Sequence, residues 1–439
     1  MSTIQNSDNF QVDSSGTQYK ITASNLRTGT ASYDNLMVER SNTLYKLEKE
    51  RRYDVQYTDL LAVERSGTTY KVSGEDYFDY MWNYNISSAY KGTITNANYG
   101  ISCAANYGLV VIGQSHYNTL TDGGRVLVYN LDGTFVRELK VPNFGGQFGK
   151  RVAIGGNRIV VSCPFYRPNS STSQTGRIYV YTLTGTTPSV TITSTLGLGN
   201  SGLAVDDNMI AASESTASLV NGAQGSVHMY NLNGSSIGNI YSTGNSSSGN
   251  ANYGECIRMG DGAMIVGQRE TTSGGASGRG RAYIYSDTSS LSHNAAPSAT
   301  FIGPDSNSNI GNQPQQVATR DGLVLIGTFT TPAYVYITDL SGSLIRTITS
   351  PVSSYTFGKS VAIGSGRIAI SDDSWDTRKG RVYTYDYDGN LHSTHSGATN
   401  YEDFGQQVDI DPGLGCIVTS SRFAFSSVGA WWSIGNTQV

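Results

Sequence analysis

A repeat of about 50 residues limits the fold of this chain more than any other feature. From about Ser88 onward the same unit recurs seven times. Each unit has a small-residue apolar strand, a second apolar strand, a variable loop, a third strand with alternating aromatic residues, and a turn leading to a fourth strand. The second strands are continuous apolar runs, which is typical of strands buried on both faces. Such units predict an all-β protein, either a closed β-propeller or an open β-solenoid.

The third strand shows the period most clearly. Its seven copies are residues 124–129, 176–181, 225–230, 280–285, 332–336, 380–385 and 429–434. Alternating side chains along each copy predict a half-buried strand with two different faces. Segments that start with Asn or Asp and end with Gly follow four of these copies, at 130–133, 231–234, 339–342 and 386–389. Gly supplies positive φ and the Asn or Asp side chain bonds the nearby backbone, so these segments predict hairpin turns.

The two ends of the repeat array distinguish a propeller from a solenoid. The seventh unit has no fourth strand after residues 429–434, and a segment with the fourth-strand pattern, 89–95, precedes the first unit. An open array needs capping units, whereas a ring must join its ends. We therefore expect residues 89–95 to pair antiparallel with residues 429–434. The predicted fold over residues 88–439 is a seven-bladed β-propeller of four-stranded blades, closed by an N-terminal strand.

An aromatic-Gly motif precedes several of the first strands. It reads FGKRVAI at 148–154, FGKSVAI at 357–363 and FGQQVDI at 404–410, with shorter versions at 99–100 and 253–254. These segments resemble the FG-GAP repeats of integrin α-subunit-type propellers. The third and fifth units lack the aromatic-Gly pair, and none of the seven has the calcium loop of that family. The resemblance therefore implies the fold, and we expect neither a metal site nor a cofactor.

Residues 1–80 carry a different repeat of about 26 residues, which would form a small domain ahead of the propeller. It occurs three times, at 8–21, 34–47 and 59–72, and each copy predicts a β-hairpin around a Ser-Gly or Ser-Asn turn. A single hairpin is only marginally stable, so we expect the three to pack on one another or on a partner chain. The repeats are thus predicted to be an attachment module. Its expected anchoring residues are Tyr19, Tyr45, Tyr70, Arg40 and Arg65.

The hairpin pattern, an acidic residue followed by LLVxRxGxxYKV, resembles short repeats in virion structural proteins of tailed phages, particularly marine phages that infect cyanobacteria. This resemblance implies a tail, fibre or decoration component in the virion. Such a protein would be present in multiple copies in a symmetric assembly and would bind other virion proteins through these repeats. The polar start of the chain lacks the basic and apolar segments of a signal peptide, so we expect assembly in the host cytoplasm and release by lysis.

Charge and hydropathy disfavour two classes of partner. The formal net charge is -4, with Lys and Arg scattered singly, so neither nucleic acid nor a membrane is an expected partner. No apolar run approaches the roughly 20 residues of a membrane-spanning helix. The four cysteines lack CxxC spacing and predict buried free thiols rather than disulfides or a zinc site.

We expect no catalytic activity, because the adjacent carboxylates at 206–207 and 372–373 would point to opposite faces of a strand. Function is expected in the variable loops between second and third strands, which share one face of the disc with the loops that join successive blades. Exposed aromatic and basic residues of these loops are the candidate contacts with a host-surface glycan or protein: Tyr117, Phe165, Tyr166, Arg167, Trp375 and Phe423. Packing of a loop against its neighbour is the alternative for each residue.

Three functions remain open from the sequence. The leading hypothesis is a non-enzymatic virion protein that displays its propeller outward. The first alternative is a propeller that binds a host receptor or glycan. The second is a glycan-degrading propeller enzyme, which would need carboxylates clustered over the central axis.

Overall fold

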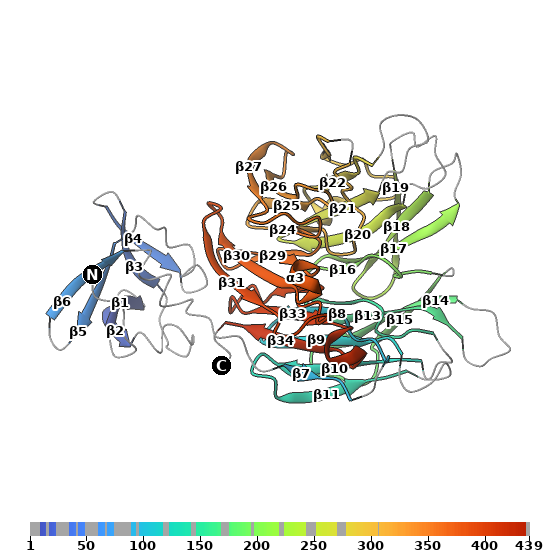
Figure 1. Cartoon of the computed structure of the whole chain (residues 1–439), viewed down its shortest axis with the longest axis horizontal. Coiled ribbons are helices and arrows are strands. Elements are labelled where there is room, and N and C mark those ends of the chain that lie inside the picture. Colours follow the sequence, from blue (N-terminus) through green and yellow to red (C-terminus); the bar gives the residue numbers. More distant parts are fainter. Residues whose placement is uncertain are drawn as a thin grey trace.

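The structure is a computed structural model, and the described residues are 9–14, 17–22, 35–40, 43–48, 60–65, 68–73, 89–93, 96–116, 123–141, 146–167, 175–194, 197–218, 224–242, 252–269, 278–305 and 307–435. Within these ranges it is an all-β structure (Figure 1) with two short α-helices, α3 (Trp375–Arg378) and α4 (Ala424–Ser427), and one 3-10 turn, η3 (Thr288–Ser290). Neither helix has the length or the hydropathy to cross a bilayer.

Six strands before residue 89 form one sheet. They are β1 (Asn9–Ser14), β2 (Thr17–Thr22), β3 (Asn35–Arg40), β4 (Thr43–Glu48), β5 (Leu60–Arg65) and β6 (Thr68–Ser73). Each odd-numbered strand pairs antiparallel with the strand that follows it, as the hairpin repeats predict, and β1 also pairs with β3 and β5. The three hairpins therefore share one sheet. Their predicted turns, at 15–16, 41–42 and 66–67, lie outside the described residues.

Seven four-stranded antiparallel sheets follow, which confirms the predicted number of blades. Blade 1 consists of β8 (Tyr99–Asn106), β9 (Leu109–Gln114), β10 (Arg125–Asn130) and β11 (Phe135–Leu139). Blade 2 consists of β12 (Val152–Gly155), β13 (Arg158–Tyr166), β14 (Thr175–Thr182) and β15 (Val190–Ser194). Blade 3 consists of β16 (Leu203–Val205), β17 (Met209–Ser218), β18 (Gln224–Asn231) and β19 (Ser236–Tyr241).

The remaining four blades have the same strand order. Blade 4 consists of β20 (Asn252–Gly260), β21 (Ala263–Arg269), β22 (Arg281–Tyr285) and β23 (Ala299–Ile302). Blade 5 consists of β24 (Val317–Arg320), β25 (Leu323–Gly327), β26 (Tyr334–Asp339) and β27 (Leu344–Thr349). Blade 6 consists of β28 (Val361–Gly364), β29 (Arg367–Asp372), β30 (Arg381–Asp386) and β31 (Leu391–Ser396). Blade 7 consists of β32 (Gln407–Ile410), β33 (Ile417–Ser421), β34 (Ala430–Ile434) and β7 (Tyr90–Lys91).

The first strands of the blades form the innermost layer of a closed ring. Each first strand contacts the first strand of the next blade, and β32 of blade 7 contacts β8 of blade 1. Gln407 joins these two blades by accepting a hydrogen bond from the backbone N–H of Cys103 at 3.3 Å and donating one to the carbonyl of Ile101 at 2.7 Å. The ring excludes the open solenoid.

The closing strand has the predicted partner and direction but is shorter than predicted. β7 pairs antiparallel with β34, with Lys91 opposite Ala430, and the N–H of Gly92 donates to the carbonyl of Gly429 at 2.9 Å. Pairing was expected over residues 89–95, and residues 94–95 of this range lie outside the described residues. The physical reason is the position of Tyr99, which already begins the innermost strand. The chain therefore passes from the outer edge of blade 7 at Lys91 to the inner edge of blade 1 at Tyr99.

The third strands are more buried than their alternation predicts. In β30 and β34 nearly every residue is buried, because the fourth strand covers one edge and neighbouring blades cover both faces. The fourth strands carry mostly exposed and half-buried side chains, throughout in β31 and with a single buried residue in β11, β15, β19 and β27. The predicted hairpin turns are confirmed by the N–H of Gly133, which donates to the carbonyl of Asn130 at 2.9 Å, and by equivalent bonds in the other three turns.

Two sequence motifs meet at the seams between blades. The aromatic residue before a first strand packs edge-to-face on the third strand of its own blade, as Phe357 does on Tyr383 at 5.4 Å. The Gly at the start of a third strand lies against the backbone of the aromatic-Gly segment in the next blade, or of its Ile-Gly equivalent in blade 5, where a Cβ would overlap a carbonyl oxygen. Five seams have this contact: Gly124–Phe148, Gly225–Tyr253, Gly280–Ile310, Gly380–Phe404 and, at the closure, Gly429–Tyr99. The two motifs therefore recur together because they form one contact.

Candidate functional site

Aromatic and guanidinium side chains form an arc on the variable-loop face of blades 5, 6 and 7. We call this arc the rim, and it comprises Phe329, Tyr355, Trp375, Arg378, Tyr401 and Phe423. Its members come from three loops between second and third strands and from two loops that join successive blades. Tyr355 and Tyr401 are the most exposed aromatic members, at 52% and 61%.

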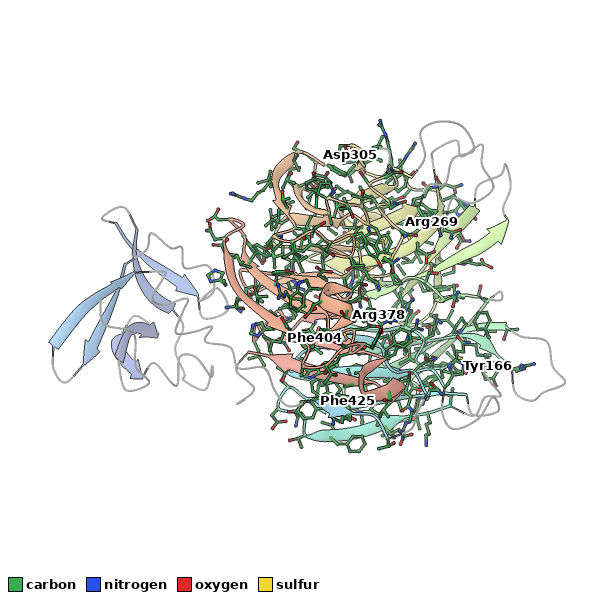
Figure 2. The ribbon with its side chains drawn as sticks, in the orientation of Figure 1. Tyr166, Arg269, Asp305, Arg378, Phe404 and Phe425 are labelled. Carbon is green, nitrogen blue, oxygen red and sulfur yellow. The ribbon has the colours of Figure 1, made fainter. Side chains whose placement is uncertain are left out.

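Arg378 is the centre of the rim. Its Nε donates to Oδ1 of Asp403 at 2.8 Å, and its Nη2 donates to Oδ2 of the same carboxylate, which is 3% exposed. This two-point bond fixes the plane of the guanidinium and raises the pKa of Arg378. The guanidinium carbon lies 5.4 Å from the ring centroid of Phe423 and 5.9 Å from that of Tyr401. The positive charge of Arg378, which is labelled in Figure 2, therefore lies within cation–π range of two aromatic side chains.

Strained backbone supports the rim in blades 6 and 7. Asp376, Thr377 and Arg378 in α3 have φ values of 46°, 57° and 62°. The equivalent loop of blade 7 has the same feature in α4, at 425–427. Left-handed conformation costs non-glycine residues roughly 1–2 kcal/mol each. Such strain concentrates at functional sites, which makes these two loops candidates for binding.

Trp375 and Tyr166, both predicted contact residues, have packing roles as well. The guanidinium carbon of Arg381 lies 3.3 Å from the ring centroid of Trp375, and that of Arg177 lies 3.6 Å from the ring centroid of Tyr166. In both blades the aromatic side chain of the loop thus stacks on the arginine that follows the Gly of the third strand. Packing against the blade, the alternative interpretation, therefore accounts for one face of each ring.

The predicted contact residues do not form a single patch. Tyr166 lies far from Arg378 and Phe425 in the plane of Figure 2. Phe165 and Arg167 flank it in blade 2 and are half-buried, and Tyr117 lies outside the described residues. Only the blade 6 and blade 7 predictions, Trp375 and Phe423, belong to the rim.

Sequence reasoning missed four members of the rim, namely Phe329, Tyr355, Arg378 and Tyr401. Arg378 shares a loop with Trp375, so its proximity was available from the repeat. Tyr355 and Tyr401 occur two and three residues before the aromatic-Gly pairs of blades 6 and 7. Those loops were assigned to the correct face, and an aromatic residue just ahead of the motif was the signal that could have identified both tyrosines.

The predicted anchoring residues lie on the strands of the N-terminal sheet. Tyr19, Tyr45 and Tyr70 occupy the same register position of their hairpins, each opposite a Val. Arg40 and Arg65 are the last residues of β3 and β5. The register equivalence shows that the three repeats superpose as hairpins, and the attachment role of these residues stays a prediction.

The central axis carries a second group of functional candidates. In blades 1 to 6 the third residue of the second strand faces one position in the first strand, and in blade 7 the second residue of β33 does so. These seven first-strand positions form the alanine ring: Ala104, Ala153, Ala204, Arg258, Ala318, Ala362 and Asp409. All seven line a narrow axial cavity of about 70 Å³. Five small side chains thus keep the inner strands close together, and the two exceptions are charged.

Arg258 and Asp409 belong to blades 4 and 7 and face each other within the ring. Nη1 of Arg258 lies 3.9 Å from Oδ1 of Asp409, and Oδ2 accepts a hydrogen bond from the N–H of Ala105 at 3.0 Å. Burial raises the pKa of Asp409, although Arg258 acts in the opposite direction. This contact joins two non-adjacent blades across the axis.

The site geometry is suited to binding. Rigid aromatic faces and fixed charges recognise a ligand without bond making or breaking. Within the part of the chain that the structure describes, no three His, Cys, Asp or Glu side chains are grouped as a metal site.

Comparisons with known proteins agree with the fold. No family model matches the chain, and no curated protein matches it. A chain in the solved structure "Crystal Structure of Mitotic Checkpoint Complex" is similar, with a TM-score of 0.51 and 12% sequence identity over 80% of this chain and 91% of that chain. At this identity the likeness shows the fold alone.

Proposed function

We propose that this protein is a non-enzymatic binding protein of a phage virion that attaches to the particle through its N-terminal repeats and presents the rim to a glycan on the host surface. The rim is the observation that carries the proposal. Exposed aromatic faces beside a fixed guanidinium provide stacking surfaces and hydrogen-bond donors, which are the contacts that a sugar ring requires. Strained loops that are held by a rigid propeller support this role.

The N-terminal sheet supports the attachment part of the proposal. Three hairpins of equal register in one sheet make a repetitive surface suited to multiple copies in a symmetric assembly, with other virion proteins as partners. The virion origin rests on the resemblance of these repeats to phage structural proteins. The relationship of the blades to FG-GAP repeats is part of the same proposal, and it agrees with recognition outside the cell.

The test of the rim is adsorption of the purified full chain to host cells. We expect Tyr401→Ala to reduce adsorption at least tenfold, whereas Tyr107→Ala, which removes a 43% exposed tyrosine from the opposite face, should leave it unchanged. Periodate treatment of the cells should abolish adsorption and protease treatment should not. Loss of adsorption after protease treatment alone would indicate a protein receptor, and equal adsorption of both variants would reject the rim.

The test of attachment is deletion of residues 1–80. We expect the remaining chain to form a soluble propeller that is absent from purified particles. Normal incorporation of the shortened chain would contradict the attachment role. Measured sugar release from host polysaccharide by the full chain would instead favour the enzyme alternative.

A further inference from the structure

A second axial cavity opens on the variable-loop face, where the residues three positions before the alanine ring in blades 1, 2, 5, 6 and 7 line it. It has a volume of about 180 Å³. We call it the entrance cavity. Its charged lining is entirely cationic among the described residues and consists of Lys150, Arg151, Lys359 and Arg422. On a chain with a formal net charge of -4, this is a local concentration of positive charge.

The cations come from three separate blades. Lys150 and Lys359 directly follow the aromatic-Gly pairs of blades 2 and 6, and Arg422 begins the loop after β33 in blade 7. Gln315 and Gln406 occupy the same position as the two lysines in blades 5 and 7 and also line the cavity. The ring geometry therefore directs donors of several blades toward one point on the axis.

One of the four cations keeps a hydrogen-bond donor that is not used. Nζ of Lys359 is paired with Asp373, and Nε of Arg151 donates to the carbonyl of Ser201 at 2.8 Å. By contrast, Nε of Arg422 is buried without a hydrogen-bond partner in the described structure. A buried donor that lacks a partner costs free energy, so a ligand that accepts from it would be favoured.

Like charges also repel one another in this cavity. Burial, followed by Arg151 and Arg422, lowers the pKa of Lys150 to about 8. Burial lowers the pKa of Arg151 to about 10 despite the nearby carboxylate of Glu255. A negative charge in the cavity would relieve this repulsion, and low local dielectric would strengthen its attraction to each cation.

We propose that the entrance cavity is an anion-binding site that takes the carboxylate or sulfate group of an acidic saccharide. The volume admits such a group together with a few waters, at about 30 Å³ per water. Arg422 connects the cavity to the rim, because its guanidinium carbon lies 4.6 Å from the ring centroid of Phe423. A sugar stacked on the rim can therefore place its acidic group over the axis. This identification rests on the proposed glycan-binding function and specifies the class of glycan.

The experiment is calorimetric titration of the full chain with sodium sulfate, sodium glucuronate and glucose at constant ionic strength. We expect sulfate and glucuronate to bind at one site and glucose not to bind. Lys150→Gln and Arg422→Gln should each weaken sulfate binding at least tenfold, because each removes a cation from the cavity. Lys140→Gln is the matched control, since Lys140 is 53% exposed beside Glu138, and it should bind sulfate like the parent.

Three results would overturn the proposal. The first is no heat of binding with sulfate. The second is equal sulfate binding by Lys150→Gln, Arg422→Gln and Lys140→Gln, which would mean an adventitious ion only, and the third is binding of sulfate without binding of glucuronate. Tyr401→Ala separates this proposal from the rim. That variant should lose adsorption to cells and retain sulfate binding. A variant that loses adsorption to cells but still binds sulfate is therefore defective in the rim. A variant that loses sulfate binding but still adsorbs is defective in the entrance cavity.

Discussion

Two layers of the central axis, only three residues apart along the same strands, differ sharply in how far the blades resemble one another. In the alanine ring five of seven positions are Ala. In the layer before it the seven blades have Ile101, Lys150, Ser201, Glu255, Gln315, Lys359 and Gln406. The inner layer is repetitive because seven strands must approach one axis closely. Five of these residues, all except Ser201 and Glu255, line the wider entrance cavity, where packing does not require one residue type.

This difference teaches where to look for function in a repeat protein. Positions at which the repeats agree are determined by packing, as are the Gly residues at the seams between blades. Positions at which they diverge, while still facing a cavity, are available for a ligand. Substitutions at repetitive positions should therefore change stability, and substitutions at divergent positions should change binding.

The largest effect is expected from Gly429→Ala at the closing seam. Gly429 has a φ of +80°, and its new Cβ would overlap the carbonyl oxygen of Tyr99. Gly262→Ala is a matched control, because Gly262 has a φ of +76° and no atom within 4 Å of such a Cβ. We expect the control to lose about 1 kcal/mol from backbone strain and Gly429→Ala to lose about 3–4 kcal/mol, since the backbones must also separate. Thermal unfolding of both variants gives the difference, and equal melting temperatures would contradict the seam contact.

The next effect concerns the two charged members of the alanine ring. Asp409→Ala should destabilise the propeller by about 3 kcal/mol, because it leaves Arg258 without its partner and the N–H of Ala105 without an acceptor. The double variant Arg258→Ala/Asp409→Ala converts all seven positions to Ala. If the ring tolerates seven alanines, the double variant should recover more than half of the loss in a denaturant titration. A double variant less stable than Asp409→Ala would show that the ion pair itself holds the ring.

The sequence predicted the architecture better than it predicted the site. The number of blades, their strands and the closing partner followed from the period, because packing repeats the same residues in every unit. The length of the closing strand could not be predicted from the repeat, because the chain must leave blade 7 in time to begin the innermost strand of blade 1 at Tyr99. The rim was predicted only in part. Trp375 and Phe423 were identified as loop aromatics, but Tyr401 contacts Arg378 because the loop that joins blades 6 and 7 packs on the loop between β29 and β30. Contacts between loops of different blades have no signature in a single repeat.

A smaller effect is expected from pH. Burial raises the pKa of Asp409, so the folded state holds this proton more tightly than the unfolded state does. Its contribution to stability is therefore complete below the ordinary pKa of an aspartate and is lost as the pH rises through the higher pKa of the folded state. Asp409→Asn removes this contribution and keeps an acceptor for Ala105. We expect the stability of the parent relative to Asp409→Asn to increase as the pH falls from 7 toward 4. A difference that is independent of pH in paired melting curves would contradict the assignment.

The smallest effect on stability is expected from Lys150→Gln in the divergent layer. The change removes repulsion with Arg151 and Arg422, so the free energy of unfolding should stay within about 0.5 kcal/mol of the parent or increase slightly. Binding should change instead. Because the pKa of Lys150 is about 8, sulfate affinity of the parent should fall as the pH rises from 7 to 9.

His116 also lies near Lys150. Burial together with Lys150 lowers the pKa of His116 below its ordinary value, so its ring is neutral throughout this range. Arg151 and Arg422 keep their charge. The pH dependence of sulfate binding should therefore disappear in Lys150→Gln and persist in Lys140→Gln. If the parent binds sulfate equally at pH 7 and pH 9, Lys150 does not contact the anion and the divergent layer loses its functional interpretation. If the pH dependence disappears in Lys150→Gln while its melting temperature is unchanged, the alanine ring serves packing and the divergent layer serves binding.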